Sequence, residues 1–254
     1  MIYFKNKKSL DTFLLVFILG AVKAYRRNYI DLNILEYYIF SMLIRLMCKK
    51  ANLSVKLLNI IADGMSLEDV DEWMARRIPI PALNDTLDDI ECSSWIALIE
   101  RELEGNTLSE ALKISTHDEK KFGIYFFTDY VEEIFWALFL LGLYEVLQKP
   151  EFISESIISC IKQSYLSEIY TCERIQDEDF QACISNLQEI ADTNISGQLS
   201  KDLITMKAKL ASLQVLLPFY GMSSDKLETG IDLKATKGMF WQIKVSGEFI
   251  DLGL

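Results

Sequence analysis

The apolar residues of the chain recur mostly at spacings of three and four, the period of a helix with one buried face. Ser9 is a candidate N-cap for a helix that ends near Arg27, and Asp31 is a candidate N-cap for the next helix. This second helix carries apolar residues close to one stripe: Ile34, Leu35, Tyr38, Met42 and Leu46. The pattern therefore predicts two helices within residues 1–50, and the second of them is amphipathic.

Caps and prolines divide residues 51–150 into further helices. Pro79 and Pro81 interrupt the chain, because a proline disfavours helical backbone in the residue before it. Helices are predicted at 54–62, from Ser66 onward, from Asp85 or Thr86 to Gly105, and briefly after Thr107. An apolar run then predicts the longest helix, which extends from residue 118 or nearby to residue 148.

The C-terminal part combines helices with a change of period. Helices are predicted from Pro150 to residue 161, at 177–191 and at 199–217. After Gly230, apolar and polar residues alternate in three short runs, at 231–234, 240–245 and 249–250, with turn residues at Gly238 and Ser246-Gly247. This alternation is typical of short antiparallel strands.

The predicted fold is mainly α, a multi-helix globular bundle with a small C-terminal antiparallel β-meander. Residues 1–230 would form the helical domain and residues 231–254 the meander. A bare meander is marginally stable, so we expect it to pack on the helices as part of one structural unit. The composition agrees, since half of the residues are apolar and only four are proline.

The cysteines and the apolar runs indicate the cellular compartment of the chain. The five cysteines match no zinc or redox spacing, and we interpret them as reduced, mostly buried thiols of a cytoplasmic protein. The apolar runs 13–22 and 134–143 are half as long as the roughly 20 residues that span a membrane. Lysines precede the first run as in a signal peptide, but its helical period continues into Arg26 and Arg27. We therefore expect buried helices and no membrane partner.

Charge is distributed unevenly along this chain of net charge −11. Residues 1–50 hold nine basic and three acidic residues, whereas residues 51–150 hold eight basic and nineteen acidic ones. The basic N-terminal residues would neutralise acids within the fold or at a homodimer contact. An acidic protein repels nucleic acid and attracts a basic protein, so the expected partner is a basic protein. We predict that it binds these acids: Glu68, Asp69, Asp71, Glu72, Asp85, Asp88, Asp89 and Glu91.

The residues that carry most enzyme and metal chemistry are nearly absent. His117 is the only histidine, and we interpret it as an exposed loop residue because no sequence feature assigns it a nucleophile. We expect no cofactor and no metal, because structural zinc sites need clusters of Cys and His ligands. Carboxylates spaced i,i+3, such as Asp88/Glu91 and Asp129/Glu132, leave a magnesium site open, although acids in a first helical turn also complement the helix dipole.

These observations favour a non-enzymatic, cytoplasmic binding protein. Its most concrete form is a bacterial inhibitor or immunity protein that neutralises a basic toxin, such as a nuclease. The alternative is a Mg²⁺-dependent all-α hydrolase that acts on phosphorylated substrates through paired carboxylates. A third hypothesis is a helical scaffold or chaperone with an apolar groove.

The lack of Cys/His clusters generates a first prediction. Thermal denaturation of the purified chain should give the same midpoint with and without a strong chelator, because no structural metal contributes to folding. A midpoint that falls by many degrees on chelation would instead support the paired-carboxylate site.

Overall fold

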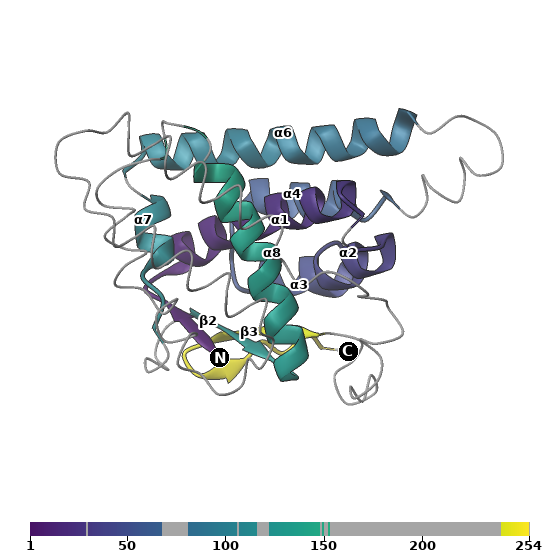
Figure 1. The fold of residues 1–254 in the computed structure, drawn as a ribbon. Coiled ribbons are helices and arrows are strands. Elements are labelled where there is room, and N and C mark those ends of the chain that lie inside the picture. Colours follow the sequence, from purple (N-terminus) through teal and green to yellow (C-terminus); the bar gives the residue numbers. More distant parts are fainter. Residues whose placement is uncertain are drawn as a thin grey trace.

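Helices form most of the structure, and a small sheet closes one end (Figure 1). In this computed structural model, the described residues are 1–28, 30–67, 81–105, 107–115, 122–147, 149, 152 and 240–253. The elements in chain order are β1 (Ile2–Phe4), α1 (Lys7–Arg26), α2 (Leu32–Tyr38), α3 (Met42–Lys50), α4 (Val55–Gly64), α6 (Pro81–Leu103), α7 (Thr107–Leu112), β2 (Phe122–Phe126), α8 (Asp129–Leu147), β3 (Trp241–Val245) and β4 (Glu248–Phe249). The predicted fold class, mainly α with a small antiparallel sheet, is confirmed.

The helix α1 runs through the centre of the fold. Every residue from Ser9 to Val22 is buried, and the helix contacts α2, α6, α7 and α8. A helix that is apolar on all sides needs such neighbours around its whole circumference. Among the described residues, no helix is both long and apolar enough to cross a membrane.

Two glycines allow α1 and α8 to cross closely. A Cβ on Gly20 would overlap the Leu138 carbonyl and lie 2.6 Å from the Gly142 nitrogen, and a Cβ on Gly142 would overlap the Val16 carbonyl. Beside this crossing, Phe13 of α1 stacks on an aromatic ring of α8 with their centroids 3.9 Å apart. The largest side chains of the core therefore interlock where the two backbones meet.

The sheet joins distant parts of the chain in the order β1-β2-β3-β4, with every pair antiparallel. Ile124 pairs with Ile2 on one side and with Ile243 on the other, and all three are fully buried. Ser246 and Gly247 have φ of 55° and 83°, the left-handed pair that a tight hairpin turn between β3 and β4 requires. The strand and turn predicted at 240–247 are confirmed.

The prediction of a helix from residue 118 is wrong at its start, because residues 122–126 form β2. This segment reads Phe-Gly-Ile-Tyr-Phe, and its backbone bonds to β1 and β3 on either side. A central strand satisfies its amide and carbonyl groups through partners far away in the sequence, which the local period does not reveal. The helix begins only at Asp129, where the Thr128 hydroxyl accepts a bond from the Val131 N–H at 3.2 Å.

The helix ends differ in three places from the predictions. Asn6, not Ser9, caps α1, because its side-chain oxygen accepts from the Ser9 N–H at 2.9 Å. The second predicted helix is divided into α2 and α3, since Ser41 caps a new start at Met42. The helix expected from Asp85 or Thr86 begins instead at Pro81, a residue that suits a first helical turn.

The Asp31 cap, the helix at 54–62 and the short helix after Thr107 are confirmed. The helix expected from Ser66, those between 150 and 217, the run 231–234 and the boundary at residue 230 lie outside the described residues, apart from single positions such as Phe152.

The α1–α8 crossing generates a second prediction. Gly20→Ala should lower the free energy of unfolding by about 1–3 kcal/mol, because the new methyl group has no space against the α8 backbone. Asn84→Ala on the exposed side of α6 is the control and should be neutral or slightly stabilising. Urea denaturation measures both, and a stabilised Gly20→Ala variant would contradict the close crossing.

Candidate functional site

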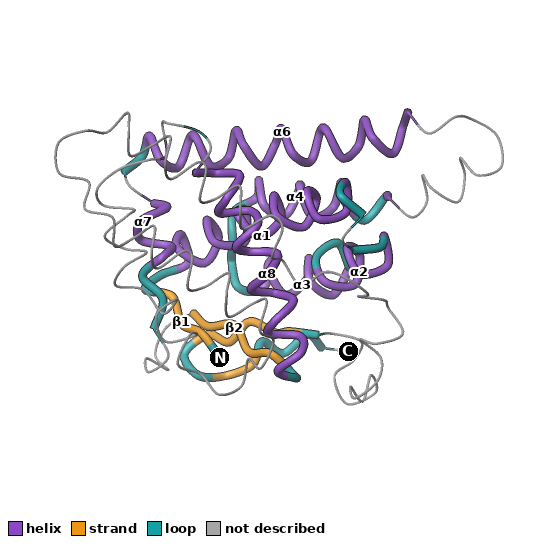
Figure 2. The backbone as a smooth tube through the Cα atoms, viewed as in Figure 1, coloured by secondary structure: helices purple, strands orange, loops and turns teal. Residues whose placement is uncertain are grey.

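The helix α6 lies at the edge of the structure, above α1 and α4 (Figure 2). The side that faces these helices is buried and consists of Leu87, Ile90, Ser94, Ala97 and Leu98. The opposite side is the outer face of α6, which we define as Asp85, Asp88, Asp89, Cys92, Ile96, Ile99 and Leu103. Spacings of three and four place these residues along one helical stripe.

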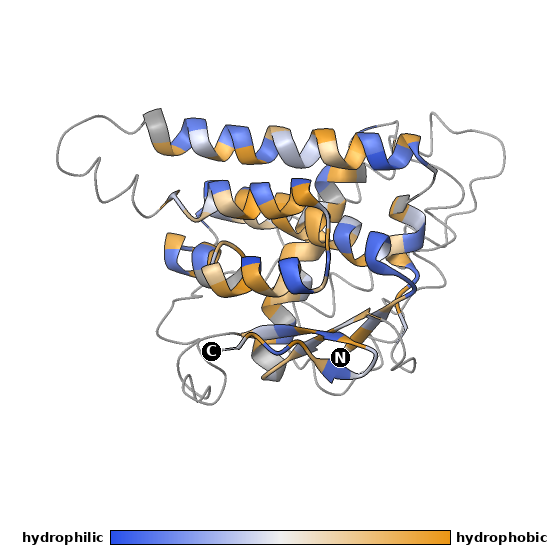
Figure 3. Cartoon of the chain, turned by 180° about the vertical axis from the view of Figure 1, so that it is seen from behind, coloured by the Kyte–Doolittle hydropathy of each residue, from blue (hydrophilic) through white to orange (hydrophobic). Residues whose placement is uncertain are grey.

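The outer face of α6 has an acidic half and an apolar half. Its first three residues are exposed aspartates, whereas Ile96, Ile99 and Leu103 are exposed to 50%, 37% and 82%. Figure 3 shows hydrophilic and hydrophobic residues following one another along this helix. The apolar half was not predicted from the sequence, although the spacing of residues 92, 96, 99 and 103 indicates a second stripe opposite the buried one.

The acids predicted to bind a partner differ in their surroundings. Asp88 and Glu91 share Arg26 of α1, which contacts Asp88 and lies 3.2 Å from the Glu91 carboxylate. Asp85 and Asp89 are exposed and have no ion pair among the described residues. The remaining predicted acids lie outside the described residues: Glu68, Asp69, Asp71 and Glu72.

Several basic residues of α1 and the segment before it neutralise acids within the fold. The pairs are Lys5–Glu110, Lys8–Glu104, Lys23–Glu145, Arg26–Asp88, Arg26–Glu91 and Arg27–Glu145. Hydrogen bonds from Lys113 and Lys5 hold the pKa of Glu110 below its ordinary value. These contacts support the first of the two alternatives for the basic N-terminal residues, neutralisation inside the molecule.

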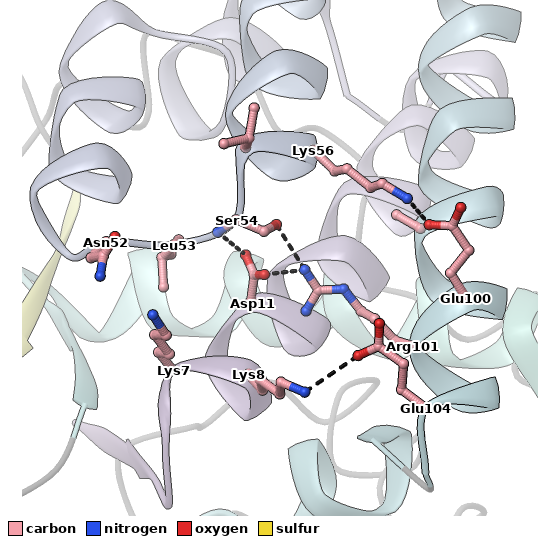
Figure 4. A pocket seen from close by; sticks show the side chains of 12 residues that line it. Lys7, Lys8, Asp11, Asn52, Leu53, Ser54, Lys56, Glu100, Arg101 and Glu104 are labelled. Atoms are coloured by element: carbon pink, nitrogen blue, oxygen red, sulfur yellow. Dashed lines mark hydrogen bonds and ion pairs between the residues drawn. The ribbon is translucent and has the colours of Figure 1, made fainter.

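A cavity of about 410 Å³ lies between α1, α4 and α6 (Figure 4). At its base the buried Asp11 forms an ion pair with Arg101 of α6. The Ser54 hydroxyl accepts a hydrogen bond from the Arg101 guanidinium at 2.7 Å, and the Ser54 N–H donates to Asp11 at 3.4 Å. This network joins all three helices at one point.

Two more ion pairs cross the mouth of the cavity, Lys8–Glu104 at 3.3 Å and Lys56–Glu100. Only Lys7 among the charged lining residues lacks a partner within the described part of the chain. The lining therefore has little excess of either sign, and its charges hold α6 against α1 and α4. We interpret the ion pairs around the cavity as structural contacts that support the outer face of α6.

The two described cysteines lie in opposite environments. Cys48 is buried, and its burial, together with the nearby Asp11 carboxylate, raises the pKa of its thiol well above the usual range. Cys92 is exposed at the middle of the outer face of α6, and the other three cysteines, which also bear on the expectation of mostly buried thiols, lie outside the described residues. The described residues contain no group of three or more Cys, His, Asp and Glu that is placed to hold a metal ion, and His117 lies outside them.

Residues 5–111 match the model of a family described as a protein of unknown function (DUF3969). The matched segment contains the cavity network and the outer face of α6, whereas β2, α8 and β3 follow it in the chain. No curated protein and no solved structure matches the chain.

The cavity network generates a third prediction. Arg101→Met should lower the free energy of unfolding by about 3–5 kcal/mol, because it leaves the Asp11 carboxylate buried without its counter-charge. Adding Asp11→Asn should recover part of this loss, since no charge then remains unpaired. Lys56→Met is the control and removes an exposed pair worth at most about 1 kcal/mol. Urea denaturation measures the free energy of unfolding of both variants. Equal losses in Arg101→Met and Lys56→Met would contradict the structural role of the Asp11–Arg101 ion pair.

Proposed function

We propose that the chain is a non-enzymatic binding protein that neutralises a basic protein through the outer face of α6. Its specific form is a cytoplasmic inhibitor or immunity protein for a basic toxin, such as a nuclease. One observation carries the proposal: exposed aspartates and exposed large apolar side chains lie end to end along one helical stripe.

The composition of this stripe suits an interface. A protein–protein interface commonly has an apolar centre beside polar or charged residues. Here the apolar residues provide area that a partner removes from water, and the aspartates provide charge that attracts a basic surface. The chain as a whole has net charge −11, which extends this attraction beyond the contact itself.

The magnesium-hydrolase alternative gains no support from the α6 carboxylates. Asp88 and Glu91, the pair that would ligate the ion, already share the Arg26 guanidinium. A cation between them would have to displace this arginine. Their geometry suits an internal ion pair better than a metal site, which favours the binding proposal over the hydrolase.

The products of the genes that neighbour the gene of this chain are the natural candidates for the partner. Each product should be purified and its growth inhibition measured with and without co-expression of the full chain. We expect one basic product whose toxicity the chain suppresses and which binds the chain directly. If no basic product is toxic, or none is neutralised, the proposed function is wrong.

The exposed aspartates generate a fourth prediction. Asp85→Lys/Asp89→Lys should slow association with the basic partner by about ten-fold at low salt and flatten its salt dependence, because steering depends on the local field. The fold should survive, since exposed substitutions usually change stability by about 0.5 kcal/mol or less.

A variant with the same change of net charge provides the control. Glu248→Lys/Asp251→Lys alters two exposed acids at the sheet end, on the opposite side of the molecule from α6 (Figure 1). Its association rate, measured by stopped-flow fluorescence, should change much less. Equal rates in the two double variants would place the interface elsewhere.

A further inference from the structure

Beyond the acids, the apolar half of the outer face lies beside a seam between α4 and α6. Ile96, Ile99 and Leu103 are exposed on α6, and Val55 at the start of α4 is 70% exposed. Four large apolar side chains on two neighbouring helices are more than the scattered single residues that a monomer surface usually shows. Their burial requires an apolar surface from outside the described part of the chain.

The seam also has room for side chains that protrude from a partner. A hollow of about 220 Å³ is lined by Ile96 and Ser93 of α6 and by Lys56, Asn59 and Asp63 of α4. Lys56 lines this hollow and also the larger cavity, so the two hollows follow one another along the seam. Hollows beside exposed apolar residues are the sites where anchoring side chains contribute most to affinity.

The charge of the chain and of this surface indicates which kind of partner binds there. A second copy would bring another net charge of −11 and the same aspartates, so it would be repelled at long range. The aspartates continue the apolar stripe towards the N-terminal end of α6. A matching segment therefore has apolar residues at one end and basic residues at the other.

We propose that the outer face of α6, with the α4–α6 seam, binds a basic amphipathic helix of the partner. Apolar side chains of this helix pack on Ile96, Ile99 and Leu103, and its lysines or arginines lie over Asp85 and Asp89. A helix of about five turns covers the span from Asp85 to Leu103. The inference rests on the proposed function and names the chemistry of the partner at that site.

Cys92 reports whether this face is occupied, because its exposed thiol lies between the two halves. The test uses the full chain with Cys160, Cys172 and Cys183 changed to serine; the buried Cys48 remains. The probe is a synthetic helix of about five turns with leucines on one face and lysines on the other. Its controls are a peptide of the same composition with scrambled order and a peptide with glutamate in place of lysine. The rate of Cys92 alkylation is measured by mass spectrometry.

The free chain should be alkylated rapidly at every chain concentration, and the basic amphipathic peptide should slow alkylation by about ten-fold or more at saturation. Neither control peptide should protect Cys92. Protection that grows with chain concentration alone would show that a second copy covers the face. Slow alkylation at every concentration would show that the chain covers it itself. Either result overturns the proposal.

Separate substitutions test the apolar contacts. Ile99→Ser/Leu103→Ser should raise the dissociation constant of the basic peptide by about ten-fold or more, mainly through faster dissociation. Met42→Ser, which changes an exposed apolar residue of α3, should leave it unchanged. An unchanged constant in the double variant overturns the apolar contact.

The two proposals fail separately. If the Ile99→Ser/Leu103→Ser variant binds a neighbouring toxin as tightly as the unchanged chain does, only this inference is refuted. A peptide that binds as described, together with no neutralised toxin, would refute only the proposed function.

Discussion

The rest of the structure depends on the close crossing of α1 and α8. Gly20 and Gly142 let the two backbones approach until each glycine lies against a carbonyl group of the other helix. This approach brings the phenylalanines of α1 into contact with the rings of α8, and Trp241 of β3 joins the same aromatic cluster. The central helix is thus fixed to the sheet and to the helices around it, and the remaining elements assemble on this core.

The helix α6 is attached to that core in a different way. Ion pairs connect it to α1 at both ends, through Arg26 of α1 near its start and through its own Arg101 near its end, and Lys56 of α4 pairs with Glu100. Asp11 and Arg101 are largely removed from water, so each needs the other to offset the cost of burial. Because these charges are satisfied internally, Asp85 and Asp89, with the apolar residues that follow them, remain available on the outside.

The internal ion pairs also change how the acidity of the chain is understood. Within the described residues, five of the nineteen acids between residues 51 and 150 form ion pairs with basic residues of α1 and the segment before it, so composition alone overstates the charge offered to a partner. In the complex that we propose, the attraction of a basic protein would depend on the carboxylates of Asp85 and Asp89, which are unpaired within the described part of the chain, and on the apolar residues beside them. Neighbouring parts of this proposed surface would then control the affinity and the association rate.

The sequence by itself determined the elements whose signals are local. The periodicity of α1, the cap at Asp31, the helix at 54–62 and the Ser246-Gly247 turn follow from contacts between residues a few positions apart. Only the tertiary structure decided that residues 122–126 form a strand, because β1 and β3 supply its hydrogen bonds. It also decided which acids are neutralised and which remain exposed. Asp88 and Asp89 are adjacent in the sequence, yet Arg26, distant along the chain, reaches only the first of them.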